Sequence, residues 1–235
     1  MVLILITGGN GDCAIEACKQ LATKPEVTKV VITCRSKEKA TKTIDSLIES
    51  TGKDPSFFGY MTMDLTDYDS IIKGVTSCPD TIARLCLNVG GLGKCEMHPV
   101  AGATDGMVLN TLGHALLCDK LIEVGKVAKG SRVIYVGGEV CHDIYYFSGL
   151  LPHYYGKFSE KDIEWAMSET YNDFLTWAFP VRAQLGDYKN AKIIGQLHFS
   201  NMAKEVPDIH FMTIFNWYVR QVNPDVVEYL ILIVI

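Results

Sequence analysis

The sequence predicts an α/β protein with a doubly wound, mostly parallel sheet of six or seven strands and helices on both faces. Two observations predict this fold: short apolar runs alternate with segments of helical periodicity, and glycines follow the first apolar run directly. The chain has 235 residues, 48% of them hydrophobic, which is enough for one sizeable core. We therefore expect one domain over residues 1–235.

The expected elements follow in order along the chain. Continuous apolar runs predict strands, because a strand buried on both faces of a parallel sheet has no polar side. These strands are expected at residues 2–6, 30–32, 57–63, 85–87, 132–136 and 210–215. Apolar residues at helical spacing predict helices at residues 14–22, 37–50, 68–75, 107–127 and 188–204. This alternation of strands and helices predicts βαβ units and hence a parallel sheet.

The composition argues against several classes of protein. Lys and Arg total 22 and Asp and Glu total 27, so the net charge of −5 disfavours a nucleic-acid partner. The eight cysteines form no C-x-x-C pair and most lie within apolar runs, which predicts reduced thiols, no metal site and a cytoplasmic location. The apolar runs at residues 2–6 and 229–235 are too short for a membrane span, and the first lacks the basic start of a signal peptide.

A glycine-rich turn predicts a dinucleotide site. Residues 9–14 fit the pattern G-x-G-x-x-(G/A) between the first strand and the first helix. In this pattern Gly9 permits the tight turn, Gly11 lets the backbone approach a pyrophosphate, and Ala14 lets the helix pack on the strand. Asp12 argues the other way, because its carboxylate would repel a phosphate unless it caps the helix and points away. A glycine turn without a ligand is the alternative.

The end of the second expected strand bears on the choice of cofactor. In dinucleotide-binding units, an acidic residue about 20 residues after the glycines binds the free ribose hydroxyl of NAD. Here the strand ends at Thr33-Cys34-Arg35-Ser36, without an acid. A guanidinium can stack on adenine and pair with a 2′-phosphate, so Arg35 favours NADP(H) over NAD(H). A solvated arginine at the start of the next helix is the alternative.

Tyr188 and Lys192 form the only Y-x-x-x-K pattern in the chain. At positions i and i+4 of the last expected helix, the two side chains share one face. A nearby ammonium favours the ionised form of a tyrosine, which can then exchange a proton with a carbonyl or alcohol oxygen. The pair therefore predicts general acid–base chemistry during hydride transfer, with the lysine also able to hold the nicotinamide ribose.

In their order and spacing, these motifs resemble the short-chain dehydrogenase/reductase family over residues 2–215. The matching segments are Thr7-Gly8-Gly9-Asn10-Gly11, Asp64-Leu65, Asn88-Val89-Gly90, Asn110, and Tyr188 with Lys192. Residues 110–114 and Cys34-Arg35 are similar to the NADPH-preferring retinol-dehydrogenase and light-dependent protochlorophyllide-reductase branches. The resemblance implies a Rossmann-type domain and an NADP(H)-dependent oxidoreductase.

The resemblance also implies roles for single residues. Tyr188 would be the general acid or base, Lys192 its electrostatic partner, and Asn110 would help hold a water chain leading to Lys192. Asp64 and Leu65 would line the adenine site, although Asp64 could simply cap the strand end and Asn110 could be a satisfied polar residue inside a helix. The residues expected to contact the cofactor are Gly8, Asn10, Gly11, Asp12, Cys13, Arg35, Asp64, Leu65, Asn88, Val89, Gly90, Tyr188 and Lys192.

The chain departs from the family pattern at three positions. Gly138 stands where the family has a serine that hydrogen-bonds the reacting oxygen, and the loss of such a donor costs about 10²–10³ in rate unless a neighbour or water replaces it. A Pro-Gly turn after the sixth strand is replaced by the aromatic segment 215–219. Asp12 replaces a glycine of the common motif. The three departures put ordinary turnover in question.

Two further segments remain. Residues 139–186 are rich in aromatic rings, and we expect them to be irregular and partly helical around residues 160–176. The family resemblance implies that they form a substrate-side insertion. Such rings suit a hydrophobic or planar small-molecule substrate, or else pack a core or subunit interface. Residues 216–235 would form a short substrate flap and a C-terminal element. The apolar tail at residues 226–235 predicts burial in the sheet or in a subunit contact, which favours a homodimer or homotetramer.

Three functions compete. The leading one is an NADP(H)-dependent oxidoreductase acting on a carbonyl, alcohol or conjugated double bond of a hydrophobic small molecule, with Tyr188 handling the proton. The second is a non-catalytic or catalytically altered NADP(H)- or ligand-binding protein of the same fold. The third is another Rossmann-like enzyme, such as a methyltransferase; such enzymes usually bind a ribose with an acid at the end of the second strand, where this chain has Arg35.

Overall fold

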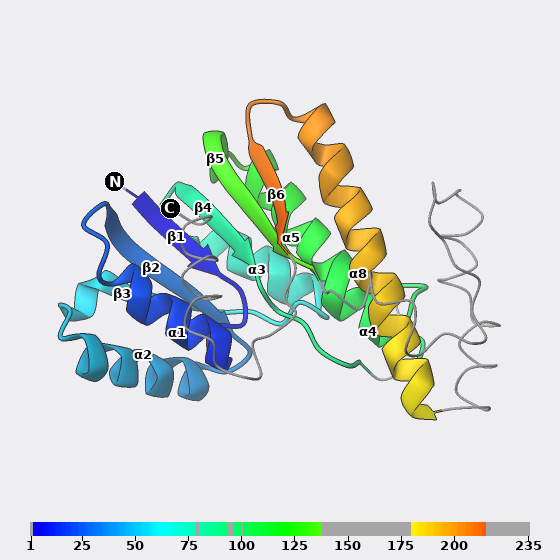
Figure 1. The fold of residues 1–235 in the computed structure, drawn as a ribbon, viewed down its shortest axis with the longest axis horizontal. Helices are drawn as coiled ribbons and strands as arrows, with labels where there is room; N and C mark the ends of the chain where they lie inside the picture. Colours follow the sequence, from blue (N-terminus) through cyan, green and yellow to red (C-terminus); the bar gives the residue numbers. More distant parts are fainter. Residues whose placement is uncertain (1, 79, 94–95, 100, 138–179, 215–235) are drawn as a thin grey trace.

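A parallel six-stranded sheet forms the centre of the molecule (Figure 1). The computed structural model describes residues 2–78, 80–93, 96–99, 101–137 and 180–214. The strand order is β3-β2-β1-β4-β5-β6, and every pairing between neighbouring strands is parallel. The strands are β1 (Val2–Ile6), β2 (Val27–Cys34), β3 (Phe58–Thr62), β4 (Ile82–Leu87), β5 (Val127–Val136) and β6 (His210–Ile214).

Helices connect these strands and cover both faces of the sheet. The helices are α1 (Asp12–Leu21), α2 (Lys37–Thr51), α3 (Tyr68–Ser77), α4 (Asp105–Met107), α5 (Gly113–Glu123) and α8 (Pro180–Glu205). Two short turns complete the described elements, namely a 3₁₀ turn, η1 (Pro55–Phe57), and a π-helical turn, η2 (Val108–Leu112), which joins α4 to α5.

The alternation of side chains along the strands builds two separate apolar layers. In β1, Ile4 and Ile6 pack with α1 and α2, whereas Leu3 and Leu5 pack with α3, α5 and α8. Successive residues of a strand point to opposite faces, so an uninterrupted apolar run fills both layers at once. The predicted doubly wound α/β fold is confirmed.

The boundaries of several elements differ from the expected ones. The helix expected at residues 107–127 is a π turn followed by α5, and it ends at Glu123 because Gly125, with a φ of 70°, leaves the helical region. The next strand consequently starts at Val127, five residues before its expected position. Helix α8 begins at Pro180, so residues 180–186 are helical rather than irregular.

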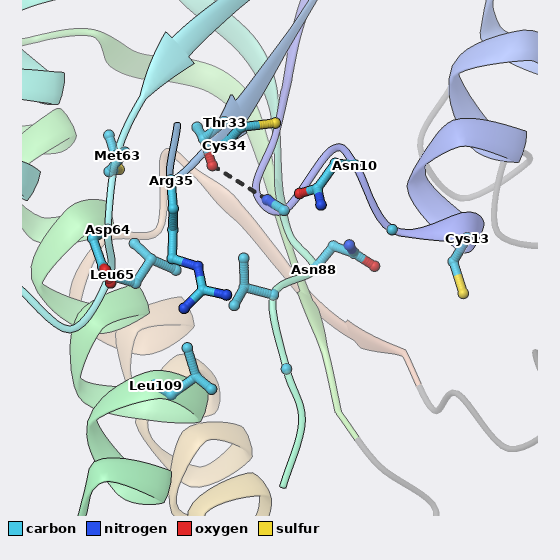
Figure 2. Close-up of a pocket in the computed structure, with 14 residues that line it drawn as sticks. Asn10, Cys13, Thr33, Cys34, Arg35, Met63, Asp64, Leu65, Asn88 and Leu109 are labelled. Atoms are coloured by element: carbon cyan, nitrogen blue, oxygen red, sulfur yellow. Dashed lines mark hydrogen bonds between the residues drawn. The ribbon is translucent and has the colours of Figure 1, made fainter. Parts of the chain in front are cut away.

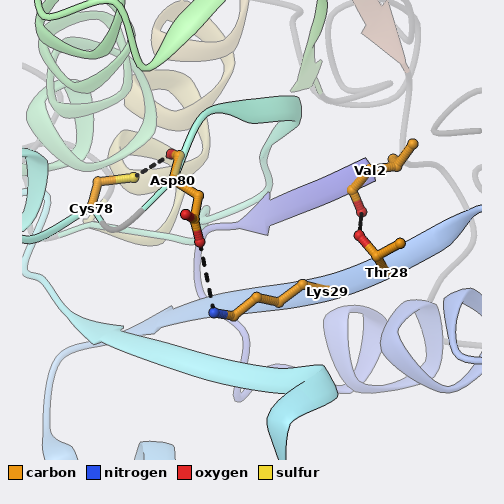
Figure 3. A network of polar contacts seen from close by, with 5 residues as sticks. All are labelled: Val2, Thr28, Lys29, Cys78 and Asp80. Atoms are coloured by element: carbon orange, nitrogen blue, oxygen red, sulfur yellow. Dashed lines mark hydrogen bonds and ion pairs between the residues drawn. The ribbon is translucent and has the colours of Figure 1, made fainter.

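The amino-terminal edge of the sheet carries a small polar network on the side of β2 (Figure 3). The Lys29 ammonium lies 3.8 Å from the Asp80 carboxylate, and both side chains are partly exposed. Nearby, the Thr28 hydroxyl donates to the carbonyl of Val2 at 3.2 Å. This edge is opposite the carboxyl ends of the strands, where ligands bind in open α/β sheets.

The predictions for other segments lie outside the described residues. This applies to the aromatic segment 138–179, to Gly138 at the serine position, and to the tail from residue 215 to 235. The predicted insertion, flap and subunit contact therefore stay predictions. Within the described residues, no helix combines the length and the apolar character that crossing a membrane requires.

Candidate functional site

A cavity of about 360 Å³ lies at the carboxyl ends of the strands, where the order reverses between β1 and β4 (Figure 2). This reversal leaves a crevice, because the connections from the two neighbouring strands turn to opposite faces of the sheet. The residues that line the cavity are Gly8, Asn10, Gly11, Cys13, Thr33, Cys34, Arg35, Met63, Asp64, Leu65, Asn88, Val89, Gly90 and Leu109.

The glycine-rich turn shapes one wall of this cavity. Gly8 has a φ of 68°, and a Cβ there would lie 2.7 Å from Cγ2 of Val89. A Cβ on Gly9 would lie 2.2 Å from Cβ of Ile32 in β2. The strained turn position is therefore Gly8 and not Gly9 as expected, whereas Gly9 permits close packing against β2. Ala14 is buried as expected, where α1 packs on the sheet.

The amino terminus of α1 lies beside the cavity. Gly11 precedes the first turn in an extended conformation, and no side chain caps the helix. The first backbone N–H groups of such a helix have no intrahelical partner and attract anions. Asp12 is exposed and does not line the cavity, unlike Asn10, Gly11 and Cys13 on either side of it. The structure therefore places the Asp12 carboxylate outside the predicted phosphate site.

The opposite end of the cavity is formed by the ends of β2 and β3. Figure 2 shows the Arg35 side chain extending from the end of β2 into the space between Leu65 and Asn88. The Asp64 carboxylate accepts hydrogen bonds from the backbone N–H and the hydroxyl of Thr66, at 2.9 and 2.8 Å. Asp64 thus does cap the chain after β3, and it also lines the cavity.

Thr7 joins the two central strands where they end. Its buried hydroxyl oxygen accepts the backbone N–H groups of Asn88 and Val89, at 2.8 and 3.0 Å. The Asn88 side-chain amide donates to the carbonyl of Thr7 at 3.1 Å. These bonds fix the segment after β4 against the glycine-rich turn, so both walls of the cavity are held in one geometry.

A buried histidine extends this network into the helical layer. His114 Nδ1 lies 3.3 Å from the carbonyl oxygen of Asn110, which can only accept, so Nδ1 carries the proton. Nε2 then accepts from the Thr7 hydroxyl at 3.2 Å. Burial and, to a smaller extent, the charge of nearby Lys192 lower the pKa of His114 to about 3, against an opposing effect of the Asn110 carbonyl. His114 is therefore neutral at physiological pH.

Asn110 lies in the π turn η2, and both the oxygen and the nitrogen of its side-chain amide form hydrogen bonds. Its Oδ1 accepts from the backbone N–H of Gly91 at 3.1 Å, and its amide donates to the carbonyls of Gly91 and Gly106 at 2.9 and 2.8 Å. Both polar atoms of the Asn110 side chain are thus hydrogen-bonded within the helical segment, as the alternative interpretation of this residue expects. These bonds nevertheless position the segment that contains Gly90.

Lys192 and Tyr188 lie on α8 next to this segment. The Lys192 ammonium donates to the carbonyl of Val136 at 2.8 Å, and the side chain is almost fully buried. Its nitrogen lies 5.7 Å from the ring centre of Tyr188, which is half-buried. The pair thus shares one face of the helix, as the i and i+4 spacing predicts.

Gly90 is the point where the cavity and the helical groups meet. A Cβ on this glycine would lie 3.0 Å from the Lys192 nitrogen and 3.1 Å from Oδ1 of Asn110. Gly90 also lines the cavity, whereas Asn110, Tyr188 and Lys192 do not. The structure therefore brings the three expected catalytic residues together at one end of the expected cofactor site.

Asp187 sits directly before Tyr188 and ties α8 to the start of α4. Its Oδ1 accepts from the Thr104 hydroxyl at 2.6 Å, while its buried Oδ2 has no hydrogen-bond partner among the described residues. Burial raises the pKa of Asp187, the Thr104 bond lowers it, and neighbouring Asp105 raises it again. Gly106 packs directly against this carboxyl, since a Cβ there would lie 1.9 Å from Oδ2.

The sequence reasoning missed several residues of the site. Thr33, Cys34, Met63 and Leu109 also line the cavity. The first three lie at or next to the carboxyl ends of predicted strands, and that position could have identified them. Tyr135, which contacts both Asn110 and Lys192, lies in an apolar strand and gave no such signal.

The described cysteines provide no metal site. Six of them are free thiols, and no group of three His, Cys, Asp or Glu side chains among the described residues could hold a metal ion. Burial raises the pKa of Cys18 to about 12, with smaller effects of Cys86 and Cys34, and burial raises that of Cys86 to about 12. These two thiols stay protonated and behave as small apolar side chains.

The strand order and the glycine-rich turn between β1 and α1 define a Rossmann-type fold. No model of a known protein family matches the chain. A short-chain dehydrogenase/reductase from Armillaria gallica is 36% identical over 140 residues, which cover 56% of this chain and 44% of the relative. The match thus spans less than half of that relative's length.

Solved structures share the fold at low sequence identity. Menthone neomenthol reductase from Mentha piperita has a TM-score of 0.67 at 18% identity, over 88% of this chain and 87% of its own. A metagenomic short-chain oxidoreductase in complex with NADP has a TM-score of 0.64 at 15% identity, over 99% and 89%. A short-chain dehydrogenase from Sphingobium yanoikuyae in complex with NADPH has a TM-score of 0.60 at 13% identity, over 92% and 71%. These solved structures show that the chain shares their fold, and part of the chain is similar in sequence to the curated relative.

Proposed function

We propose that the protein is an NADP(H)-dependent oxidoreductase that transfers hydride to or from a carbonyl, alcohol or conjugated double bond of a hydrophobic small molecule. One observation carries the proposal. Gly90 lines the cavity and at the same time contacts the Lys192 ammonium and the Asn110 amide, with Tyr188 one turn away on α8. A dinucleotide in the cavity would thus end beside a group able to exchange a proton.

The residues of the cavity fit a phosphorylated dinucleotide. Gly8 and Gly11 leave backbone exposed next to the first turn of α1, where pyrophosphate oxygens could accept N–H groups. Arg35 places a guanidinium at the other end of the same cavity, where a 2′-phosphate would be paired. The proposed preference for NADP(H) over NAD(H) rests on Arg35. Two structural neighbours with bound NADP or NADPH are consistent with it.

The proton chemistry falls to Tyr188 and Lys192. The nicotinamide, when bound, supplies or takes up the hydride. The Tyr188 hydroxyl donates or accepts the proton on the substrate oxygen, and the buried Lys192 ammonium favours the ionised state of that hydroxyl. The Val136 carbonyl holds the ammonium in place from β5. The aromatic composition of residues 139–186 favours a hydrophobic substrate.

A fluorescence titration with NADPH and NADH, followed by a screen of hydrophobic aldehydes and ketones, tests the proposal. We expect NADPH to bind more tightly than NADH, and we expect nicotinamide absorbance to fall with at least one carbonyl compound. Tyr188→Phe should lower turnover by about 10²–10⁴ while leaving NADPH affinity within about twofold. Lys189→Ala, one residue along α8, is the matched control and should keep its activity. Absence of binding to either nucleotide would refute the proposal.

A second function has its own supporting observation. Gly138 replaces the family serine, and residues 216–217 replace a Pro-Gly turn with Asn-Trp, so the fold could serve to bind NADP(H) or another ligand without ordinary turnover. Gly138→Ser distinguishes the two functions. If the protein is an enzyme limited by this missing hydroxyl, the rate should rise by up to about 10²-fold. Tight NADPH binding without turnover in either form, unaffected by Tyr188→Phe, would favour the binding protein.

A further inference from the structure

Tyr135 is a buried phenol that contacts two of the three expected catalytic residues. It lies in β5 with no measurable exposure, and its hydroxyl donates to the carbonyl oxygen of Asn110 at 2.8 Å. The Lys192 nitrogen lies 5.0 Å from the centre of its ring, within the range of a cation–π contact. A buried tyrosine normally needs such a partner for its hydroxyl, and here that partner is in the π turn.

The Asn110 carbonyl oxygen accepts from two side chains. Tyr135 donates to it from β5 and His114 Nδ1 donates to it from α5, at 2.8 and 3.3 Å. A carbonyl oxygen has two lone pairs, so two side-chain donors can share it. The water chain that the family resemblance implies at Asn110 would have to compete with Tyr135 for this oxygen.

The ring of Tyr135 is held on several sides. A Cβ on Gly195 of α8 would lie 2.3 Å from the Tyr135 hydroxyl oxygen, so the absence of a side chain there makes room for the phenol. The ring of Phe199 lies 4.8 Å away and that of His114 5.9 Å away, measured between ring centres. Gly195 and Phe199 follow Lys192 by three and seven residues, so one face of α8 receives the phenol and presents the ammonium to it.

Two neighbouring positions of β5 therefore hold the ammonium. Val136 accepts one of its N–H groups through its carbonyl oxygen at 2.8 Å, and Tyr135 offers its ring face. A cation–π contact is strongest where the cation is shielded from water, and Lys192 is 1% exposed.

We propose that Tyr135 is a positioning residue for the Tyr188–Lys192 pair: its ring holds the Lys192 ammonium, and its hydroxyl fixes the orientation of that ring through the Asn110 carbonyl. The proposal rests on the proposed function, because it gives Tyr188 and Lys192 their roles in proton transfer. Tyr135 acts through Lys192 and does not touch the reacting atoms.

The other ionisable groups around the pair lie on several elements. His114 on α5 is neutral, since burial lowers its pKa to about 3. Asp187 on α8 is bonded to Thr104, and burial raises its pKa. Asp105 on α4 and Lys189 on α8 are further charged groups on the elements around the pair. Substitution of Tyr135 leaves Asp187, Asp105 and Lys189 in place, and its direct neighbour His114 is neutral in the unsubstituted protein, so we attribute a shift in Tyr188 titration to Lys192.

Two substitutions separate the ring from the hydroxyl. Tyr135→Phe keeps the ring and removes the bond to Asn110, whereas Tyr135→Leu removes both. We measure the ionisation of Tyr188 from the ultraviolet absorbance of phenolate, as the difference between each protein and the same protein carrying Tyr188→Phe. This titration needs no turnover, so it remains informative if the proposed oxidoreductase activity is absent.

We expect the titration midpoint of Tyr188 to rise by about one pH unit in Tyr135→Leu and by a smaller amount in Tyr135→Phe, because a less well-held ammonium stabilises the phenolate less. If turnover is found, kcat should show the same shift in its pH profile with KM nearly unchanged. A purely structural tyrosine would lower the thermal midpoint of both variants and leave the titration of Tyr188 where it was. That result would overturn the proposal. If Tyr135→Leu fails to fold, Tyr135→Met, which keeps the volume, takes its place under the same two outcomes.

Discussion

The two halves of the candidate site are built in opposite ways. The open side consists of the cavity from Gly8 to Arg35 and Asp64, whose lining includes the exposed residues Asn10, Gly11, Arg35 and Gly90. The closed side consists of Thr7, Asn110, His114, Tyr135 and Lys192, which are all buried and bonded to one another or to nearby carbonyls. The two sides touch at Gly90.

This difference separates two tasks. A surface for a dinucleotide must leave backbone donors unpaired until the ligand arrives, so it contributes little to the stability of the fold. A buried polar network must satisfy its own groups, since each one left unpaired costs about 1–3 kcal/mol. Substitutions of exposed side chains on the open side, such as Arg35, should therefore change binding alone, and those on the closed side should also change the free energy of unfolding.

The largest effect is expected for Gly113→Ala on the closed side. A Cβ at this position would lie 2.1 Å from the carbonyl oxygen of Leu65, and backbone cannot move aside as a side chain can. We expect a loss of about 3 kcal/mol in the free energy of unfolding, at the upper end of overpacking effects. Gly91→Ala is the control, because no atom of the described residues lies within 4 Å of its Cβ position. Urea denaturation of both variants provides the measurement; equal stability would contradict the close contact.

The next largest effect on the free energy of unfolding is expected for substitution of His114, and this effect depends on pH. Its folded-state pKa of about 3 lies below the ordinary value of 6.5, so the unfolded chain takes up a proton first as the pH falls. The contribution of His114 is therefore complete above about pH 6.5 and is lost toward pH 3, at roughly 1.4 kcal/mol per pH unit. Between pH 6.5 and pH 4.5, the unsubstituted protein should lose free energy of unfolding, as measured from denaturation curves. We expect this loss to be up to about 2.7 kcal/mol larger than the loss in His114→Asn.

His210→Asn provides the control for this measurement, because His210 is exposed on β6. As an exposed substitution it should change the free energy of unfolding by less than about 0.5 kcal/mol. An identical pH dependence in His114→Asn and the unsubstituted protein would mean that the fold does not hold His114 neutral. It would contradict the role of His114 in the buried network of the closed side.

Arg35→Ala tests the open side. Loss of a charge-assisted bond to a 2′-phosphate should weaken NADPH binding by about 10- to 100-fold, and NADH binding should change little. The free energy of unfolding should stay within about 0.5 kcal/mol, because Arg35 is exposed. Lys39→Ala removes a nearby positive charge that does not line the cavity, so it controls for long-range attraction. Fluorescence titrations of the three proteins make the comparison; equal losses for both nucleotides would remove the preference for NADP(H).

The smallest effect is expected at the amino-terminal edge of the sheet, away from both sides of the site. Lys29→Ala removes an ion pair of 3.8 Å between partly exposed groups. We expect a change below about 0.5 kcal/mol in the free energy of unfolding and no change in NADPH affinity. A larger loss in thermal denaturation would show that stability in this fold is not concentrated around the closed side.

The open side could largely be predicted from the sequence, because its signals are local. Apolar strands fix where the carboxyl ends lie, and the residues that follow them directly, such as Gly8, Arg35 and Asn88, then share one edge. Asp12 is the exception. Its neighbours line the cavity, but the first turn of α1 rotates its side chain outward, and the sequence spacing does not contain that rotation.

The closed side could be predicted only in part. Tyr188 and Lys192 are visible as an i and i+4 pair, but Tyr135 looks like one more apolar strand residue. Its role depends on Gly195, 60 residues later in the chain, and on the Asn110 carbonyl in the π turn. Neither is a property of the segment around Tyr135. The helix expected at residues 107–127 is present as far as Glu123, but its π turn was not predicted, since apolar periodicity does not distinguish an α turn from a π turn.

The π turn η2 has a consequence for how this chain can tolerate length changes. A π turn holds one residue more than the α turn it replaces, and here the backbone N–H of Gly113 reaches back to the carbonyl of Val108. Deletion of one residue within 108–112 would restore a regular α-helix and rotate α4 by about 100° relative to α5. The helix would then be locally more regular, yet Asn110 would no longer face Gly91. In this segment a single-residue deletion should therefore be more damaging than most substitutions, although it improves the hydrogen bonding of the helix itself.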